Sequence, residues 1–184
     1  MKKGQFLIFA LYVGIQSFLL QLIDQLIGTH LTSGGHSGFV FIAFQGWALY
    51  FLLGSNLKGA VKGLLGYILG ILFAVIMIIL SNIFAGAGIL AVPIVALIVV
   101  PFMMYFEFAP WCISNVSVFF IGAGAFFGVM NYVEGVTKLC AAGIVLLYCT
   151  LGLASGWMSI LFRNRLEEIC WKKKEAKEEY QSYE

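Results

Sequence analysis

The sequence predicts an all-α, polytopic membrane protein with six transmembrane helices, arranged as two inverted three-helix repeats. Its 184 residues are 61% hydrophobic and 11% charged, whereas soluble domains are about 45–50% apolar and about 25% charged. Between Gly4 and Phe162 the only Lys, Arg, Asp or Glu residues are Asp24, Lys58, Lys62, Glu107, Glu134 and Lys138. This composition excludes a nucleic-acid-binding protein and a soluble enzyme with a solvated cleft.

The apolar stretches define six spans, because a helix needs about 20 apolar residues to cross about 30 Å of hydrocarbon. The first span covers residues 5–28, and a shorter second span lies near 39–54, after a Gly- and Ser-rich loop. The charge-free stretch 63–106 is too long for one crossing and breaks at residues 81–88. The remaining spans are therefore expected near 60–80, 87–106, 115–131 and 138–161.

The basic residues predict the orientation of the chain. With the N-terminus in the cytoplasm, ten of the eleven Lys and Arg residues face inward and only Lys138 faces outward, as the positive-inside rule requires. We therefore expect a multi-pass protein of the bacterial inner membrane with both termini in the cytoplasm. Residues 1–162 form the six-helix domain, and residues 163–184 form a charged, amphipathic cytoplasmic tail.

The two halves of the chain resemble each other, which indicates an internal repeat of about 5–80 and about 81–161. A shift of 76 residues places residues 44–68 over 120–144 without a gap, with identical pairs Phe44/Phe120, Gly46/Gly122, Phe51/Phe127, Gly59/Gly135, Lys62/Lys138 and Ile68/Ile144. Glycine-rich apolar helices also match by chance, so the duplication is a hypothesis. Three spans per copy would invert the second copy, and such inverted repeats are common in transporters and channels.

The segment GWALYFLLGSNLKGAVKGLLGYILGI, starting at Gly46, resembles the YcdZ-like family of small, functionally uncharacterised bacterial inner-membrane proteins. The resemblance covers most of residues 5–162. It implies an inner-membrane location and a multi-span fold, and it implies no substrate or catalytic residue.

The short second and fifth spans suggest half-helices that meet around a pore, because their polar ends fall at matched positions. The pore candidates are Trp47, Tyr50, Phe51, Ser55, Asn56, Phe126, Phe127 and Asn131. Aromatic rings can form a constriction that rejects hydrated ions by dewetting. The alternative is ordinary helix packing for the aromatic residues and helix capping for the polar ones.

Charged residues near the span ends are candidates for the mouths of such a path. Lys58 and Lys62 would lie at the inner mouth, and Glu134 and Lys138 at the outer one. The outer loop also carries His30 and His36, and histidine can change its charge at mildly acidic pH, so this loop is a candidate gate.

Two carboxylates, Asp24 and Glu107, are candidates for ion coupling, since coupled transport needs an ionisable group within the membrane. Their positions near span ends favour the simpler interpretation of solvated carboxylates at the headgroup level. Spans without a central charge indicate a passive path.

The sequence contains no nucleophile–base motif, phosphate-binding loop or paired metal-ligand spacing, so we expect no enzyme activity, no cofactor and no metal site. Small-xxx-small glycine pairs favour close helix packing, within one chain or in a homo-oligomer.

The leading hypothesis is a channel or facilitative transporter for a small polar solute of the urea, amide or small carboxylic acid class. The alternatives are a proton- or cation-coupled secondary transporter, and a scaffold that docks a cytoplasmic partner through its tail. Membrane lipid is an expected partner in every case.

Overall fold

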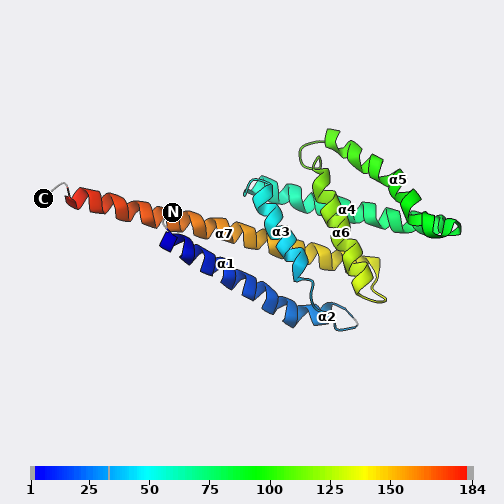
Figure 1. The fold of residues 1–184 in the computed structure, drawn as a ribbon, viewed down its shortest axis with the longest axis horizontal. Helices are drawn as coiled ribbons and strands as arrows, with labels where there is room; N and C mark the ends of the chain where they lie inside the picture. Colours follow the sequence, from blue (N-terminus) through cyan, green and yellow to red (C-terminus); the bar gives the residue numbers. More distant parts are fainter. Residues whose placement is uncertain (1–2, 33, 182–184) are drawn as a thin grey trace.

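In a computed structural model, the described residues, 3–32 and 34–181, form helices joined by short connections (Figure 1). Met1, Lys2 and the last three residues of the predicted tail lie outside the described part. The first span comprises α1 (Lys3–Ile23), a π-helical segment (Asp24–Gly28) and α2 (Thr29–Leu31). The second and third spans are α3 (Val40–Leu52) and α4 (Leu57–Ile83).

The second half of the chain has the same order of elements. A 3-10 segment (Ala85–Leu90), α5 (Ala91–Met104) and a second 3-10 segment (Tyr105–Phe108) form the fourth span. Helix α6 (Val116–Tyr132) and helix α7 (Lys138–Gln181) follow. The all-helical architecture predicted from the sequence is confirmed, and no strand occurs in the residues that the structure describes.

Four helical segments are long and apolar enough to cross a membrane, namely Phe6–Leu31, Leu57–Ile83, Ala85–Phe108 and Lys138–Ile169. Helices α3 and α6 have 13 and 17 residues. At 1.5 Å per residue they are about 20 Å and about 26 Å long, shorter than the hydrocarbon core. The expectation that the second and fifth helices are short is therefore confirmed for both.

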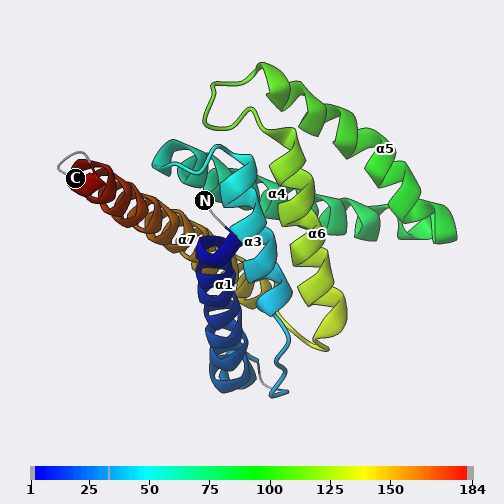
Figure 2. The ribbon, with the colours of Figure 1, turned by 60° about the vertical axis from the view of Figure 1, so that its left-hand side comes forward.

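The helices form two layers, with α3 and α6 lying across α4 and α7, and with α1 and α5 at the periphery (Figures 1 and 2). The chain runs in opposite directions in α3 and α6, and likewise in α4 and α7. The most extensive contacts join α3 to α7 and α4 to α6. Each short helix therefore packs mainly on the long helix of the other half, so the two halves interlock.

Glycines at the two main interfaces show that these interfaces are equivalent. A Cβ on Gly152 of α7 would meet the carbonyl oxygen of Ala43, and a Cβ on Gly70 of α4 would meet the carbonyl oxygen of Phe119. Ala43 and Phe119 differ by 76 positions, as predicted, whereas Gly70 and Gly152 differ by 82. The two halves are thus related by different shifts in the short and the long helices.

The ungapped alignment is therefore wrong beyond the short helices, and Lys62 is not the counterpart of Lys138. Helix α6 is four residues longer than α3, and the connection that follows it is one residue longer, which accounts for five of the six positions by which the shift increases. A shift of 82 gives identical pairs along the long helices, at Leu57/Leu139, Ala60/Ala142, Leu64/Leu146, Leu65/Leu147, Leu69/Leu151, Gly70/Gly152 and Ile78/Ile160.

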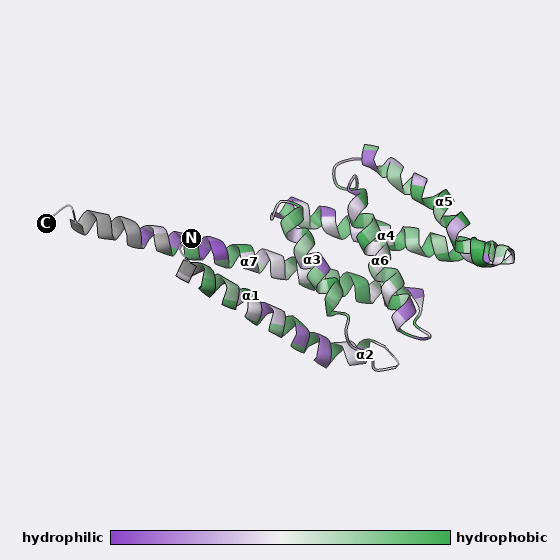
Figure 3. Ribbon diagram, viewed as in Figure 1, coloured by the Kyte–Doolittle hydropathy of each residue, from purple (hydrophilic) through white to green (hydrophobic). Residues whose placement is uncertain are grey.

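Apolar residues predominate along the helices, and hydrophilic residues lie at the end of α1, near several connections and in α7 just before the part drawn in grey (Figure 3). Helix α7 continues from the span into the predicted tail without a break. The core lies between the two layers, and its largest fully buried side chains include Tyr67, Tyr148, Phe39, Phe119 and Phe126.

Candidate functional site

The carboxylate of Asp24 is the centre of a buried polar site at the start of α3. Asp24 is 0% exposed. Its Oδ2 accepts a hydrogen bond from the backbone N–H of Gly38 at 2.7 Å, and its Oδ1 accepts one from Phe39 at 3.0 Å. The hydroxyl of Tyr148, on α7, donates to Oδ1 at 2.6 Å. The site therefore joins α1, α3 and α7.

The local backbone explains how a carboxylate reaches this position. Asp24 opens the π-helical segment, and such bulges are frequent at functional sites. A Cβ on Gly28 would lie 3.2 Å from Oδ1 of Asp24, 3.2 Å from the Cα of Ser37 and 3.3 Å from the Tyr148 hydroxyl. Because Gly28 has no side chain, the loop at Ser37 can approach the carboxylate of Asp24 closely.

The carboxylate of Asp24 accepts hydrogen bonds from three donors, namely two backbone N–H groups and one hydroxyl. The two N–H groups precede the first turn of α3, where the helix dipole is positive and favours an anion. Asp24 lies seven residues before the end of α2, or about 10 Å along the helix. The expectation of a solvated headgroup carboxylate is wrong for Asp24, because the loop before α3 folds over it.

A second buried polar cluster lies between α1 and α7 and was not predicted. Ser159 donates to the side-chain oxygen of Gln16 at 2.7 Å, and the amide nitrogen of Gln16 donates to the carbonyl of Ser155 at 3.3 Å. Gln16 is 6% exposed and Ser159 is 0% exposed. The first span therefore makes buried side-chain hydrogen bonds to α7 at two places, through Asp24 to Tyr148 and through Gln16 to Ser159.

Replacing Ser159 with alanine should lower the free energy of unfolding by about 1 kcal/mol, which is within the range for hydrogen bonds between membrane helices. Thr150→Ala is the matched control on α7, because Thr150 is exposed and donates to the carbonyl of Leu146 within its own helix. Thermal unfolding in detergent measures both variants. An equal effect of the two substitutions would contradict a contribution from the contact with Gln16.

The predicted pore residues do not converge on a common cavity. Trp47, Tyr50 and Phe126 are buried in the core between the layers, so the packing interpretation holds for them within one chain. Asn56 caps α4, since its Oδ1 accepts a hydrogen bond from the N–H of Gly59 at 2.8 Å. The other predicted pore residues are partly or fully exposed, namely Phe51, Ser55, Phe127 and Asn131.

Two of the mouth and gating candidates, Lys62 and His36, are half-buried, and the others lie on the surface. Lys62 is half-buried and donates to the hydroxyl of Ser114 at 3.4 Å. The ring of His36 packs edge-on against Tyr132, with ring centroids 5.6 Å apart. The remaining candidates are exposed, namely His30, Lys58, Glu134 and Lys138, and the coupling candidate Glu107 is also exposed.

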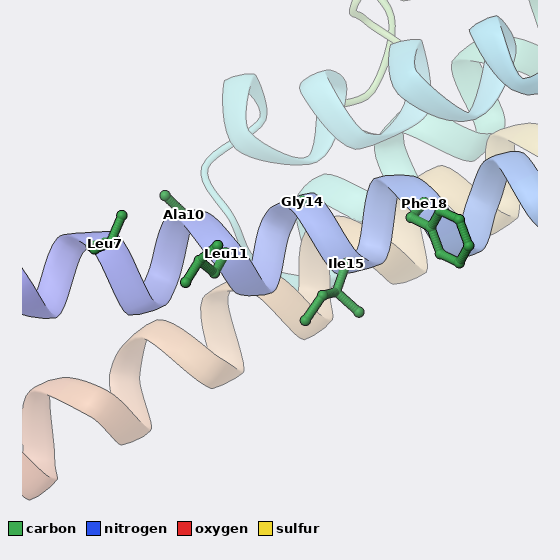
Figure 4. Close-up of a pocket in the computed structure, with 6 residues that line it drawn as sticks. All are labelled: Leu7, Ala10, Leu11, Gly14, Ile15 and Phe18. Atoms are coloured by element: carbon green, nitrogen blue, oxygen red, sulfur yellow. The ribbon is translucent and has the colours of Figure 1, made fainter.

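Three surface grooves have mostly apolar walls. One of about 380 Å³ runs along α1 between Leu7 and Phe18 (Figure 4). One of about 300 Å³ lies between α4 and α7, and one of about 660 Å³ lies beside the end of α5. Such walls suit lipid chains or other apolar groups better than a polar solute. Among the described residues, no cluster of three or more His, Cys, Asp or Glu side chains could hold a metal ion.

Comparison with known proteins identifies one family. The family model described as "Protein of unknown function (DUF1097)" matches residues 10–164. No curated protein and no solved structure matches the chain. The family match spans all six helical segments from within α1 into α7. The chain therefore belongs to the family of proteins of unknown function DUF1097.

Proposed function

We propose that the protein is a channel or facilitative transporter for a small polar solute, of the urea, amide or small carboxylic acid class. The observation that supports this function is the interlocked arrangement of the two halves, in which two short antiparallel helices lie across two long ones. Inverted repeats with interrupted or short helices are a recurring architecture of transport proteins. The bacterial inner-membrane location implied by the YcdZ-like resemblance, with both termini in the cytoplasm, is part of the proposal.

We place the solute path between copies of the chain, because the grooves of one copy have mostly apolar walls. Equivalent phenylalanines of α3 and α6 support this placement. Phe44 and Phe120 are 41% and 46% exposed, and Phe51 and Phe127 are also incompletely buried. Close helix packing within one copy explains why α3 and α6 both have glycine at the matched positions 46 and 122. It does not explain why both helices have phenylalanine at these incompletely buried matched positions. These rings would form the constriction in a homo-oligomer.

Flux measurements in proteoliposomes test the proposal. Stopped-flow light scattering with gradients of urea, glycerol, acetamide, formate and acetate should show one solute crossing faster than in empty vesicles, without saturation. Dissipating the ion gradients should leave that flux unchanged. No acceleration for any of these solutes, with folded protein in the vesicles, would contradict the proposal.

A second candidate function, proton- or cation-coupled transport, is favoured by the burial of Asp24. A coupled carrier would accumulate solute against its gradient. Asp24→Asn should abolish that accumulation while exchange or leak persists. A passive channel would show no accumulation with either residue.

The third candidate is a scaffold that binds a cytoplasmic protein through the tail. Deleting residues 172–184, which follow the apolar span of α7, separates this role from transport. A channel should retain its flux after the deletion, whereas a scaffold should lose its function.

A further inference from the structure

The groove between α4 and α7 has the geometry of a lipid site. Leu57, Ala60, Val61 and Leu64 line it from α4, and Thr150, Leu153, Ala154 and Trp157 line it from α7, with Tyr50 of α3 beside them. Because α4 and α7 are antiparallel, Leu57 and Trp157 lie at one end of the groove. Their exposed fractions are 78% and 53%, so this end is accessible from the membrane.

The wall of the groove is mostly apolar, and the hydroxyl of Thr150 is already engaged. Thr150 donates to the carbonyl of Leu146 at 2.8 Å, which satisfies the threonine within its own helix. Alanines at positions 60 and 154 leave space between the two helices. A flexible hydrocarbon chain fits such a groove, and it takes no hydrogen bond away from Thr150.

The end of the groove near Leu57 carries an uncompensated positive charge. Lys58 is exposed and lies in the first turn of α4, where the helix dipole adds positive potential. In the part of the chain that the structure describes, Lys58 has no ion-pair partner, whereas Arg163 and Arg165 pair with Glu167 and Glu168. The charge of Lys58 is thus complementary to a phosphate.

Trp157 lies at the same end of the groove as Leu57, and its side chain also suits a phospholipid. An indole has an apolar body and one N–H donor, and tryptophan accordingly concentrates at the level of lipid headgroups. Trp157 and the first turn of α4, which carries Lys58, thus provide a donor and a cation at the end of the groove where a phospholipid headgroup would lie.

Three of the four α4 residues that line the groove have identical counterparts in α7. The α4 positions Leu57, Ala60 and Leu64 correspond at a shift of 82 to Leu139, Ala142 and Leu146 of α7, with identical residues. Leu57 and Leu139 are 78% and 83% exposed, so packing within the chain does not account for their identity. Trp157 has no tryptophan counterpart in the first half, because the α4 residue at the same shift is Val75.

From these observations we infer that the α4–α7 groove binds one anionic phospholipid. Its acyl chain lies between Ala60 and Ala154, and its phosphate lies beside Lys58 at the Trp157 end. Basic residues at the end of an apolar groove between transmembrane helices are typical of anionic-lipid sites. The inference is independent of whether the protein transports a solute.

Quenching of Trp157 fluorescence by brominated phospholipids tests the inference in vesicles that contain the full chain. The difference between wild type and Trp157→Phe isolates the emission of Trp157. At equal mole fraction, brominated phosphatidylglycerol should have about fivefold higher affinity for the quenching site than brominated phosphatidylcholine. This ratio corresponds to about 1 kcal/mol for one lysine near an anionic lipid.

Two charge variants test the role of Lys58. Lys58→Gln should abolish the preference for phosphatidylglycerol. Lys62→Gln is the matched control, because it removes the same charge one turn further along α4, where Lys62 bonds to Ser114 of the α5–α6 connection. The control should retain the preference.

Filling the groove tests the acyl-chain site separately. Ala154→Leu should reduce the phosphatidylglycerol that co-purifies with the protein, as measured by mass spectrometry of the extracted lipids. Equal quenching by the two lipids, an equal effect of both lysine variants, or unchanged co-purification with Ala154→Leu would each overturn the inference.

Discussion

Replacing Gly152 with alanine is expected to lower the free energy of unfolding by about 2–4 kcal/mol, which is at or above the usual range for overpacked cores. The added methyl group would meet the carbonyl oxygen of Ala43 and would lie 2.8 Å from the backbone nitrogen of Trp47. Both contacts are with backbone atoms, so no side-chain rotation relieves them. Helix α3 would have to move away from α7, and the interface between the two halves would open.

Gly143→Ala is the matched control on the same helix. A Cβ at Gly143 would have no neighbour within 4 Å, so the substitution should be neutral or should stabilise the helix by up to about 1 kcal/mol. Gly70→Ala, at the equivalent interface with Phe119, should be as harmful as Gly152→Ala. Thermal unfolding in detergent and steric trapping in bilayers measure these changes. A tolerated Gly152→Ala would contradict the close crossing of α3 and α7.

Replacing Asp24 with alanine is expected to destabilise the protein by about 3–5 kcal/mol, toward the low end of the sum for three buried donors that lose their acceptor. The substitution leaves three donors without their acceptor, namely the N–H groups of Gly38 and Phe39 and the hydroxyl of Tyr148. Each buried, unsatisfied donor costs about 1–3 kcal/mol. The start of α3 should detach from α1 and α7.

Conservative variants separate the contributions at this site. Asp24→Asn keeps one acceptor oxygen and should lose less stability than Asp24→Ala. Tyr148→Phe should cost about 1.5–3 kcal/mol, the range for a hydrogen bond to a charged group. In the double variant the two losses should be less than additive, because both remove one contact. Additive losses, or an Asp24→Ala variant as stable as wild type, would show that the carboxylate does not hold α3.

The helical architecture was predictable from the sequence because each helix carries its own signal. The stretch near 39–54 contains α3 (Val40–Leu52), and the stretch near 115–131 matches α6 (Val116–Tyr132) within one residue at each end. Apolar composition and polar connections are local properties, so they specify these helices without reference to the rest of the fold.

The buried site was only partly predictable because its contacts are distant in sequence. Asp24 was recognised as a candidate, but its partner Tyr148 lies 124 positions away, and no spacing rule connects them. Gln16 and Ser159 were missed for the same reason, since they are separated by 143 positions. The register of the second half was mistaken because extra residues in and after α6 shift α7 relative to α4.

The uninterrupted course of α7 has a practical consequence for imaging. With a mass of 20.3 kDa, this chain is a small particle for cryo-electron microscopy, with little mass outside the bilayer to guide alignment. Helix α7 has 44 residues and is about 66 Å long, and it extends beyond the apolar span that ends at Ile169. A helical marker protein joined in register at Gln181 would therefore form a rigid fiducial. Each inserted residue would rotate the marker by about 100° around the helix axis, so its direction can be chosen to clear the membrane.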